Sequence, residues 1–122
     1  MINSDITDKV IKAFYNVYNT LGYGFLEKVY ENAMIIELRK MGSQVEAQKN
    51  IKVHYEGKEI GDYYADLFVD NSVIVELKTA ENICKEHEYQ LINYLKATES
   101  ETGLLLNFGK KAEFKRKVFS NK

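Results

Sequence analysis

Two apolar stretches joined by a short polar turn constrain the fold of this chain more than any other feature. Residues 60–69 and 73–78 are apolar at adjacent as well as alternating positions, and Asp70-Asn71-Ser72 separates them. A half-exposed strand alternates polar with apolar residues, whereas a strand covered on both faces is apolar throughout. The segment therefore predicts two central strands of a sheet that has cover on both sides.

Helical periodicity before and after these strands predicts that cover. Apolar residues recur at helical spacing in residues 6–21, and further helices are expected at 25–41 and 85–97. The predicted order is helix, helix, four strands, helix and two strands, which is an α/β sandwich with a mixed sheet at its centre. The apolar stripe of the second helix is expected to comprise Leu26, Val29, Ala33 and Ile36.

Length and composition suit one soluble domain, residues 1–122, with a single core. Cys84 is the only cysteine, so an intramolecular disulfide is excluded and a reducing compartment is the default. The first residues lack a signal-peptide pattern, and no apolar run approaches the roughly 18 residues that span a bilayer. We expect a cytoplasmic protein without a membrane segment.

The net charge of −1 argues against a protein held on nucleic acid by bulk electrostatics. Basic residues nevertheless gather at the C-terminal end, either as a strip that binds phosphates or as solvated charges that keep an edge strand soluble. The predicted last strand, residues 114–119, could also pair with a second copy and form a homodimer. The six basic residues are Lys110, Lys111, Lys115, Arg116, Lys117 and Lys122.

The central hairpin carries an acidic pair. With a three-residue loop centred on Asn71, Asp66 lies opposite Glu76, with Cβ atoms about 4.5 to 5.5 Å apart, and Lys78 lies on the same face. A two-residue loop would place the two carboxylates on opposite faces. Facing carboxylates in an apolar sheet need a cation or a shared proton. Magnesium meets that need with oxygen ligands, whereas the alternative is a buried ion-pair network of Asp66, Glu76 and Lys78 without chemistry.

The helices offer further polar residues. Glu27 heads a stripe that continues through Tyr30, Met34, Leu38 and Met41. It should face inward near the start of the second helix, although a capping role would also explain it. Its neighbour Glu31 is expected to be solvated. In the later helix His87, Gln90 and Tyr94 project from one face, and an amide such as Gln90 that points at the sheet needs a partner. His87 is equally well explained as an ordinary, partly exposed histidine.

These residues resemble the GxxExxY family of the PD-(D/E)XK nuclease superfamily. The naming motif is Gly24-Phe25-Leu26-Glu27-Lys28-Val29-Tyr30, and the resemblance continues through residues 64–67, 75–78, 87–95 and 103–109. It implies a restriction-endonuclease-like sandwich in a small bacterial or archaeal protein. One departure is Ala65, which stands in place of the signature proline.

The resemblance also implies roles for individual residues. Asp66, Glu76 and the main-chain carbonyl of Leu77 would bind Mg²⁺, for which Mn²⁺ can substitute, and Glu27 would complete the acidic shell. Lys78 would act on the attacking water. The pair Gln90 and Tyr94 resembles the QxxxY element of exonuclease-like branches of the superfamily.

The leading hypothesis is a metal-dependent nuclease that hydrolyses phosphodiester bonds of nucleic acid, with DNA favoured over RNA. The alternative is a catalytically silent nucleic-acid-binding or assembly module that retains the fold. The complete acidic set with Lys78 favours the enzyme, and the small basic surface argues against it.

Overall fold

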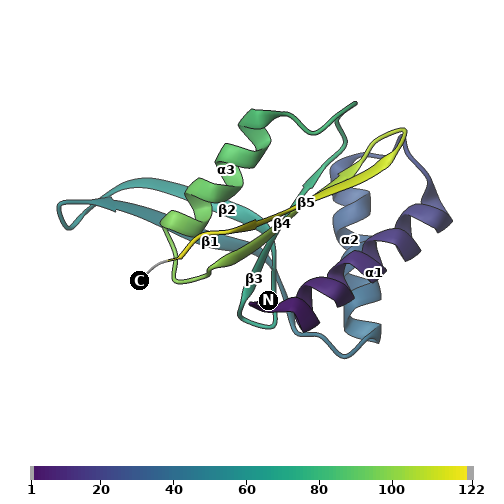
Figure 1. Ribbon diagram of the computed structural model, residues 1–122, viewed down its shortest axis with the longest axis horizontal. Coiled ribbons are helices and arrows are strands. Elements are labelled where there is room, and N and C mark those ends of the chain that lie inside the picture. The colour runs from purple at the N-terminus through teal and green to yellow at the C-terminus, as the bar shows by residue number, and fades with distance from the viewer. Residues whose placement is uncertain (1, 121–122) are drawn as a thin grey trace.

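The computed structural model describes residues 2–120, which form one five-stranded sheet with helices on both faces (Figure 1). The predicted α/β class and order of elements are confirmed, with residues 45–55 forming one strand rather than two. Lys122 of the basic C-terminal strip lies outside the described residues. The elements are α1 (Ser4–Leu21), α2 (Glu27–Lys40), β1 (Val45–Tyr55), β2 (Lys58–Val69), β3 (Val73–Lys78), α3 (Lys85–Lys96), β4 (Thr102–Phe108) and β5 (Ala112–Val118).

The sheet is mixed, as the sequence predicts. Its order is β1-β2-β3-β4-β5, and the neighbours are antiparallel except for β3 and β4. Two parallel neighbours require a crossover connection, and α3 supplies it. Strand β5 is an edge strand, as expected for the last strand of the chain.

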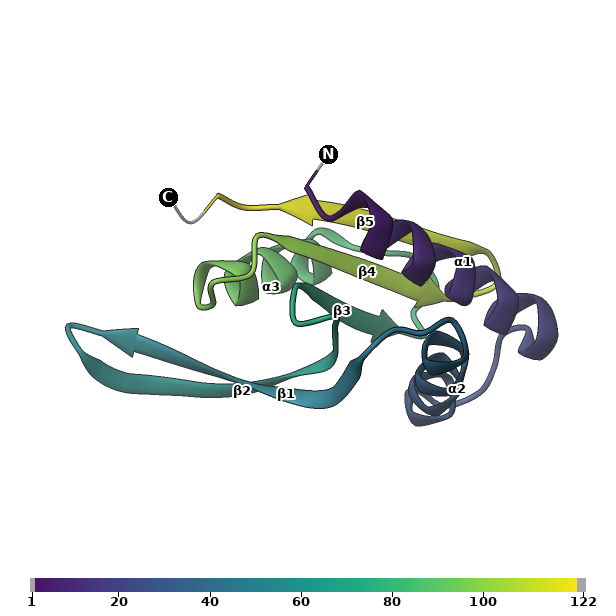
Figure 2. The same cartoon turned by 90° about the horizontal axis from the view of Figure 1, so that it is seen from below.

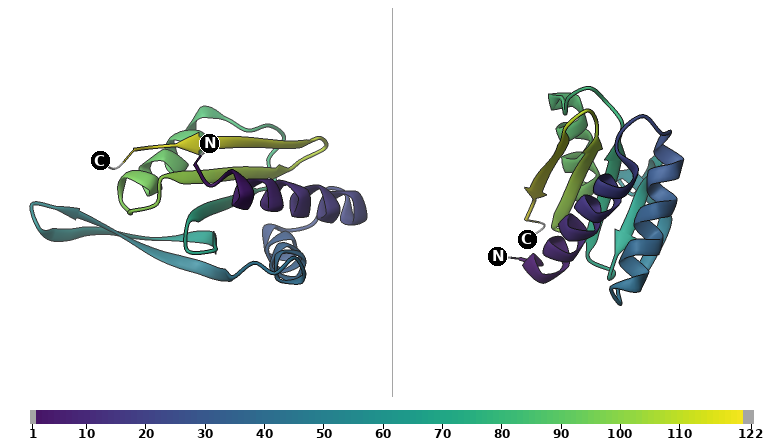
Figure 3. Two further views of the ribbon diagram at one scale, coloured as in Figure 1. Left: turned by 60° about the horizontal axis from the view of Figure 1, so that its bottom comes forward. Right: turned by 90° about the vertical axis from the view of Figure 1, so that its right-hand side faces the viewer.

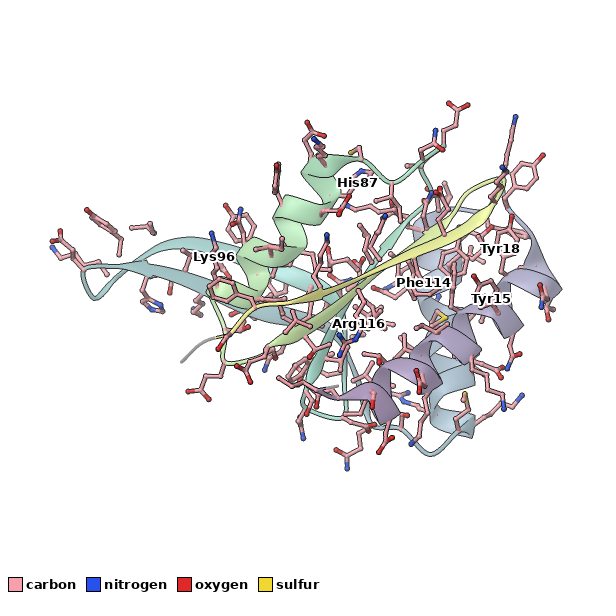
Figure 4. The ribbon with its side chains drawn as sticks, viewed as in Figure 1. Tyr15, Tyr18, His87, Lys96, Phe114 and Arg116 are labelled. Atoms are coloured by element: carbon pink, nitrogen blue, oxygen red, sulfur yellow. The ribbon has the colours of Figure 1, made fainter. Side chains whose placement is uncertain are left out.

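Two apolar clusters hold the layers together. The helices α1 and α2 pack on one face of the sheet, and α3 packs on the other (Figure 2). In the first cluster the buried ring of Tyr30 stacks on Phe108 at 4.2 Å between centroids, and Phe14 meets the same Phe108 edge-on. In the second cluster Leu91 and Leu95 of α3 cover Leu105 of β4. At the margin of the first cluster Tyr15 lies edge-on to Phe114 (Figure 4).

The buried face of α2 differs from the predicted stripe. Leu26 and Ile36 are 79% and 62% exposed, so the stripe of Leu26, Val29, Ala33 and Ile36 does not form the buried face. Tyr30, Met34 and Leu38, which share the predicted inward stripe of Glu27, are buried, and Glu31 is buried with them.

The β1–β2 hairpin extends well beyond the rest of the sheet (Figures 2 and 3). The two strands pair along almost their whole length, whereas β3 pairs with β2 only from Leu67 to Val69. The outer part of the hairpin therefore has no strand neighbour on the β3 side. No helix in residues 2–120 is both long and apolar enough to cross a membrane.

Candidate metal centre

The acidic pair lies where the β2–β3 ladder ends. Val69 pairs with Val73 and Leu67 with Val75, which is the register predicted for a three-residue loop. At the next position the carboxylates replace the backbone bonds: Glu76 Oε2 accepts from the Asp66 N–H at 2.7 Å, and Asp66 Oδ2 accepts from the Leu77 N–H at 2.7 Å. Asp66 and Glu76 are therefore brought together between two separating strands.

The ladder on the other side of Asp66 is interrupted as well. Ala47 pairs with Leu67 and Lys49 with Ala65, but the pair Gln48–Asp66 between them is missing. Gln48 has a φ of 54°, a left-handed conformation that is uncommon in residues other than glycine and costs of order 1–3 kcal/mol. The sheet thus loses its regular hydrogen bonds on both sides of Asp66.

A small pocket of about 180 Å³ opens between this point of the sheet and α2. Glu31, expected to be solvated, is only 3% exposed; it accepts from Lys28 Nζ at 2.5 Å and from Gln48 Nε2 at 2.5 Å. The signal for its position was its spacing of four residues from Glu27, which puts both on one side of a helix. Gln48 had no such signal. The pocket is lined by Glu27, Lys28, Glu31, Gln48, Asp66 and Leu77.

Tyr30 supports the turn that presents Glu27. Its hydroxyl donates to the Gly22 carbonyl at 2.6 Å and accepts from the Phe25 N–H at 3.3 Å. Gly24 in the same turn has a φ of 110°, a conformation available to glycine. Glu27, the first residue of α2, is exposed at the rim of the pocket. Tyr30 is fully buried, so it positions the turn and does not line the pocket.

Burial and neighbouring negative charges raise the pKa of both carboxylates. Burial, followed by the charge of Asp66, raises the pKa of Glu76 to about 8. Burial also raises the pKa of Asp66, and the charges of Glu31 and Glu27 act in the same direction. The positive charge of Lys78 opposes both shifts. None of the ion pairs formed by residues 2–120 joins Lys78 to either carboxylate, so the ion-pair network considered above is not formed.

On the opposite side of the sheet, α3 contributes Gln90 and Tyr94. Burial, and then the charges of Glu76 and Asp66, raise the pKa of Tyr94 to about 12, while a hydrogen bond from Gln90 acts against this shift. Tyr94 therefore lies within electrostatic reach of the acidic pair. His87 lies seven residues earlier, about 10 Å along the helix axis. Its Nδ1 accepts from the Cys84 N–H at 3.3 Å, at the start of α3 (Figure 4).

The donor set fits a hard divalent cation. Each carboxylate of the acidic pair uses one oxygen in a backbone hydrogen bond, which leaves Oδ1 of Asp66 and Oε1 of Glu76 for a metal. Within the described part of the chain, no three His, Cys, Asp or Glu side chains are close enough to enclose a metal. Mg²⁺ does not need such a cage, because it commonly binds one or two carboxylates and completes its shell with waters and phosphate.

Comparison with known proteins agrees with this geometry. The family model described as "PD-(D/E)XK nuclease superfamily" matches residues 4–117. The chain belongs to this superfamily. A mixed sheet with helices on both faces is consistent with its restriction-endonuclease-like fold. PD-(D/E)XK nucleases typically use divalent metals, which agrees with the oxygen donors of this site.

Similarity to individual proteins is more distant. The crystal structure of SSO0001 superposes with a TM-score of 0.60 at 17% sequence identity, which shows a shared fold. The alignment covers 98% of this chain and 61% of that protein, so this PD-(D/E)XK chain spans less than two thirds of its length. A search of curated proteins finds no match.

Proposed function

We propose that this chain is a nuclease of the GxxExxY family that hydrolyses phosphodiester bonds, with DNA favoured over RNA as its substrate. The observation that carries the proposal is the acidic pair. Asp66 and Glu76 interrupt the sheet; Glu76 is buried and Asp66 half-buried, and the charge of Asp66 opposes ionisation of Glu76. Such an arrangement destabilises a domain unless a cation or a shared proton neutralises it.

The proposed ligands of Mg²⁺ are Asp66, Glu76 and the carbonyl oxygen of Leu77, with Glu27 at the rim of the pocket. Mn²⁺, which also favours oxygen ligands, can substitute. When bound, the cation polarises a phosphate oxygen and makes a water molecule more acidic. The backbone hydrogen bonds of Asp66 and Glu76 hold their carboxylates in place, so that the free oxygens would be positioned for the cation.

Lys78 has a different role from the ligands. It is half-buried and lies two residues after Glu76 on β3. None of the ion pairs of residues 2–120 joins it to the acidic pair. Its ammonium group is therefore available to orient the attacking water and to stabilise the negative charge that develops on the phosphate. Gln90 and Tyr94 close the site from α3. His87 accepts a hydrogen bond from the Cys84 N–H at the start of that helix.

Two further proposals concern the protein's setting. A single cysteine, Cys84, which is exposed and free, is compatible with the reducing cytoplasm. The edge strand β5 has one free side, where a second copy could extend the sheet into a homodimer.

The experiment that tests the function is a cleavage assay of purified protein on labelled single- and double-stranded DNA and RNA, with Mg²⁺, Mn²⁺ or EDTA. We expect cleavage of DNA with either cation and none with EDTA. Asp66→Asn serves as the contamination control and should be inactive. Binding without cleavage in all of these conditions would identify the chain as the silent module instead.

A further inference from the structure

A groove of about 810 Å³ separates the outer part of the β1–β2 hairpin from α3. Its volume lies within the range of about 300 to 1,000 Å³ that is typical of ligand sites. The acidic pair lies outside its lining, so the metal centre does not account for it. The groove is lined by Lys52 and Tyr63 of the hairpin and by Tyr89, Gln90, Asn93 and Tyr94 of α3, among others.

Exposed tyrosine rings face the groove from both walls. Tyr89 is 60% exposed and Tyr63 is 49% exposed, and neither belongs to a buried cluster. The rings of Tyr63 and Tyr94 lie 5.8 Å apart between centroids and are tilted by 43°. Since these rings contribute little to the core, their gathering marks a surface that contacts a partner.

The groove leads to the metal centre. Gln90 and Tyr94 line it, and the ring of Tyr63, 5.8 Å from that of Tyr94, belongs to the residue three positions before Asp66 on β2. A strand bound on Tyr63 therefore lies about 10 Å along β2 from the acidic pair. At the outer end, Lys96 lies in the last turn of α3 (Figure 4).

The chemistry of the lining matches an unpaired polynucleotide strand. Tyrosine faces stack on bases of any sequence, but only where the bases are not already stacked within a duplex. The amides of Gln90 and Asn93 can donate to and accept from base edges. Lys96 places one positive charge beside the groove, whereas Glu86 adds a negative charge. Lys52 is paired with Glu59 at 3.1 Å, so stacking rather than phosphate binding supplies the expected affinity.

We propose that this groove binds a single strand of DNA, stacks its bases on Tyr63 and Tyr89, and directs its backbone to Asp66 and Glu76. The consequence that single-stranded DNA is the preferred substrate rests on the nuclease function proposed above. Binding in the groove does not rest on it.

The test is the affinity for a fluorescein-labelled oligomer of about 15 thymidines, measured by anisotropy in EDTA so that no cleavage occurs. Tyr63→Ala and Tyr89→Ala should each weaken binding about 5- to 100-fold, as expected for the loss of one stacked base. Tyr63→Phe and Tyr89→Phe should retain binding, because the ring and not the hydroxyl stacks. A blunt duplex of the same length should bind more weakly and be insensitive to all four changes.

Tyr64→Ala is the matched control. Tyr64 is the next residue of β2 and is 55% exposed, but it lies outside the lining of the groove, since successive side chains of a strand point to opposite faces. Its replacement should leave the affinity unchanged. Equal losses for Tyr63→Ala and Tyr64→Ala, or no loss for Tyr63→Ala and Tyr89→Ala, would overturn the proposal.

Two further measurements separate the possible failures. If Tyr63→Ala dissociates a dimer in gel filtration and leaves oligomer binding intact, the groove holds a second copy and the proposal is overturned. If the wild type binds the oligomer through Tyr63 and Tyr89 but never cleaves it, the proposed binding in the groove is supported and the proposed nuclease function is overturned. If Tyr63→Ala and Tyr89→Ala cleave the single-stranded oligomer at the wild-type rate and bind it with unchanged affinity, the nuclease function is retained and the groove proposal is overturned.

Discussion

At the scale of single residues, the buried carboxyl group of Glu76 should make the stability of the metal-free protein depend on pH. Burial, followed by the charge of Asp66, raises the pKa of Glu76 from 4.5 to about 8. A carboxyl group with a raised pKa in the folded state stabilises the fold fully below its unfolded pKa, and this contribution is lost as the pH rises towards the folded pKa. The pKa of Asp66 is raised as well, which acts in the same direction.

We therefore predict that the melting temperature in EDTA falls as the pH rises from about 4.5 to 8. The loss is at most about 4 to 5 kcal/mol from Glu76, by linkage. Glu76→Gln, which cannot ionise, should flatten this dependence. Thermal unfolding followed by circular dichroism across this pH range checks the prediction, and a wild-type curve that is flat or rises with pH would contradict it.

Lys78 distinguishes catalysis from a structural role. If it stabilises charge that develops on the phosphate, Lys78→Ala should lower cleavage by about 10² or more and leave DNA binding in Ca²⁺ nearly unchanged. If Lys78 has only a structural role, its charge offsets those of Asp66 and Glu76 without an ion pair, and the substitution should instead lower the melting temperature. Paired measurements of cleavage rate and melting temperature decide between these outcomes.

At the scale of elements, the turn before α2 depends on one buried hydroxyl. Tyr30→Phe removes the bonds to the Gly22 carbonyl and the Phe25 N–H, which should destabilise the protein by about 1 to 3 kcal/mol. Because Glu27 begins α2 directly after this turn, we also expect weaker Mg²⁺ binding. Tyr23→Phe in the same turn, where the side chain is exposed, is the matched control and should melt like the wild type.

The elements also show what could be predicted from the sequence. The register of the acidic hairpin followed from side-chain alternation and loop length, which are local properties. The structure confirms it from Val69–Val73 to Leu67–Val75, whereas at Asp66 and Glu76 side-chain bonds replace the ladder. The prediction of an apolar stripe through Leu26 and Ile36 of α2 was wrong, because both side chains are exposed. Helical spacing offers several stripes on such a segment, and only packing against the sheet selects one.

Two parts of the site depend on long-range geometry and could not be predicted. Gln48 enters the pocket through a left-handed backbone conformation in the middle of a strand, which no residue pattern indicates. The groove between the hairpin and α3 joins residues about 30 positions apart, such as Tyr63 and Tyr94. The spacing of Gln90 and Tyr94 could be recognised in the sequence, whereas the position of the β1–β2 hairpin opposite them could not.

At the scale of the whole molecule, the metal centre links binding to folding. Asp66 lies on β2, Glu76 on β3 and Glu27 on α2, so the ligands come together only when sheet and helix are assembled. A cation that binds the folded state alone stabilises it by RT ln(1 + [L]/Kd), or about 2.7 kcal/mol at a hundredfold excess over Kd. The melting temperature should therefore rise with Mg²⁺ concentration.

The variant Asp66→Asn separates this linkage from a general salt effect. The substitution removes a ligand and at the same time relieves the repulsion that raises the pKa of Glu76. We expect the metal-free variant to be as stable as the wild type or more stable at pH 8, and to lose most of the Mg²⁺ response. Asp62→Asn, a change of the same chemistry at an exposed position of β2, is the matched control and should respond to Mg²⁺ like the wild type. Identical melting curves for the wild type in Mg²⁺ and in EDTA would count against a metal site at the acidic pair, because a cation that binds only the folded state cannot leave the free energy of unfolding unchanged.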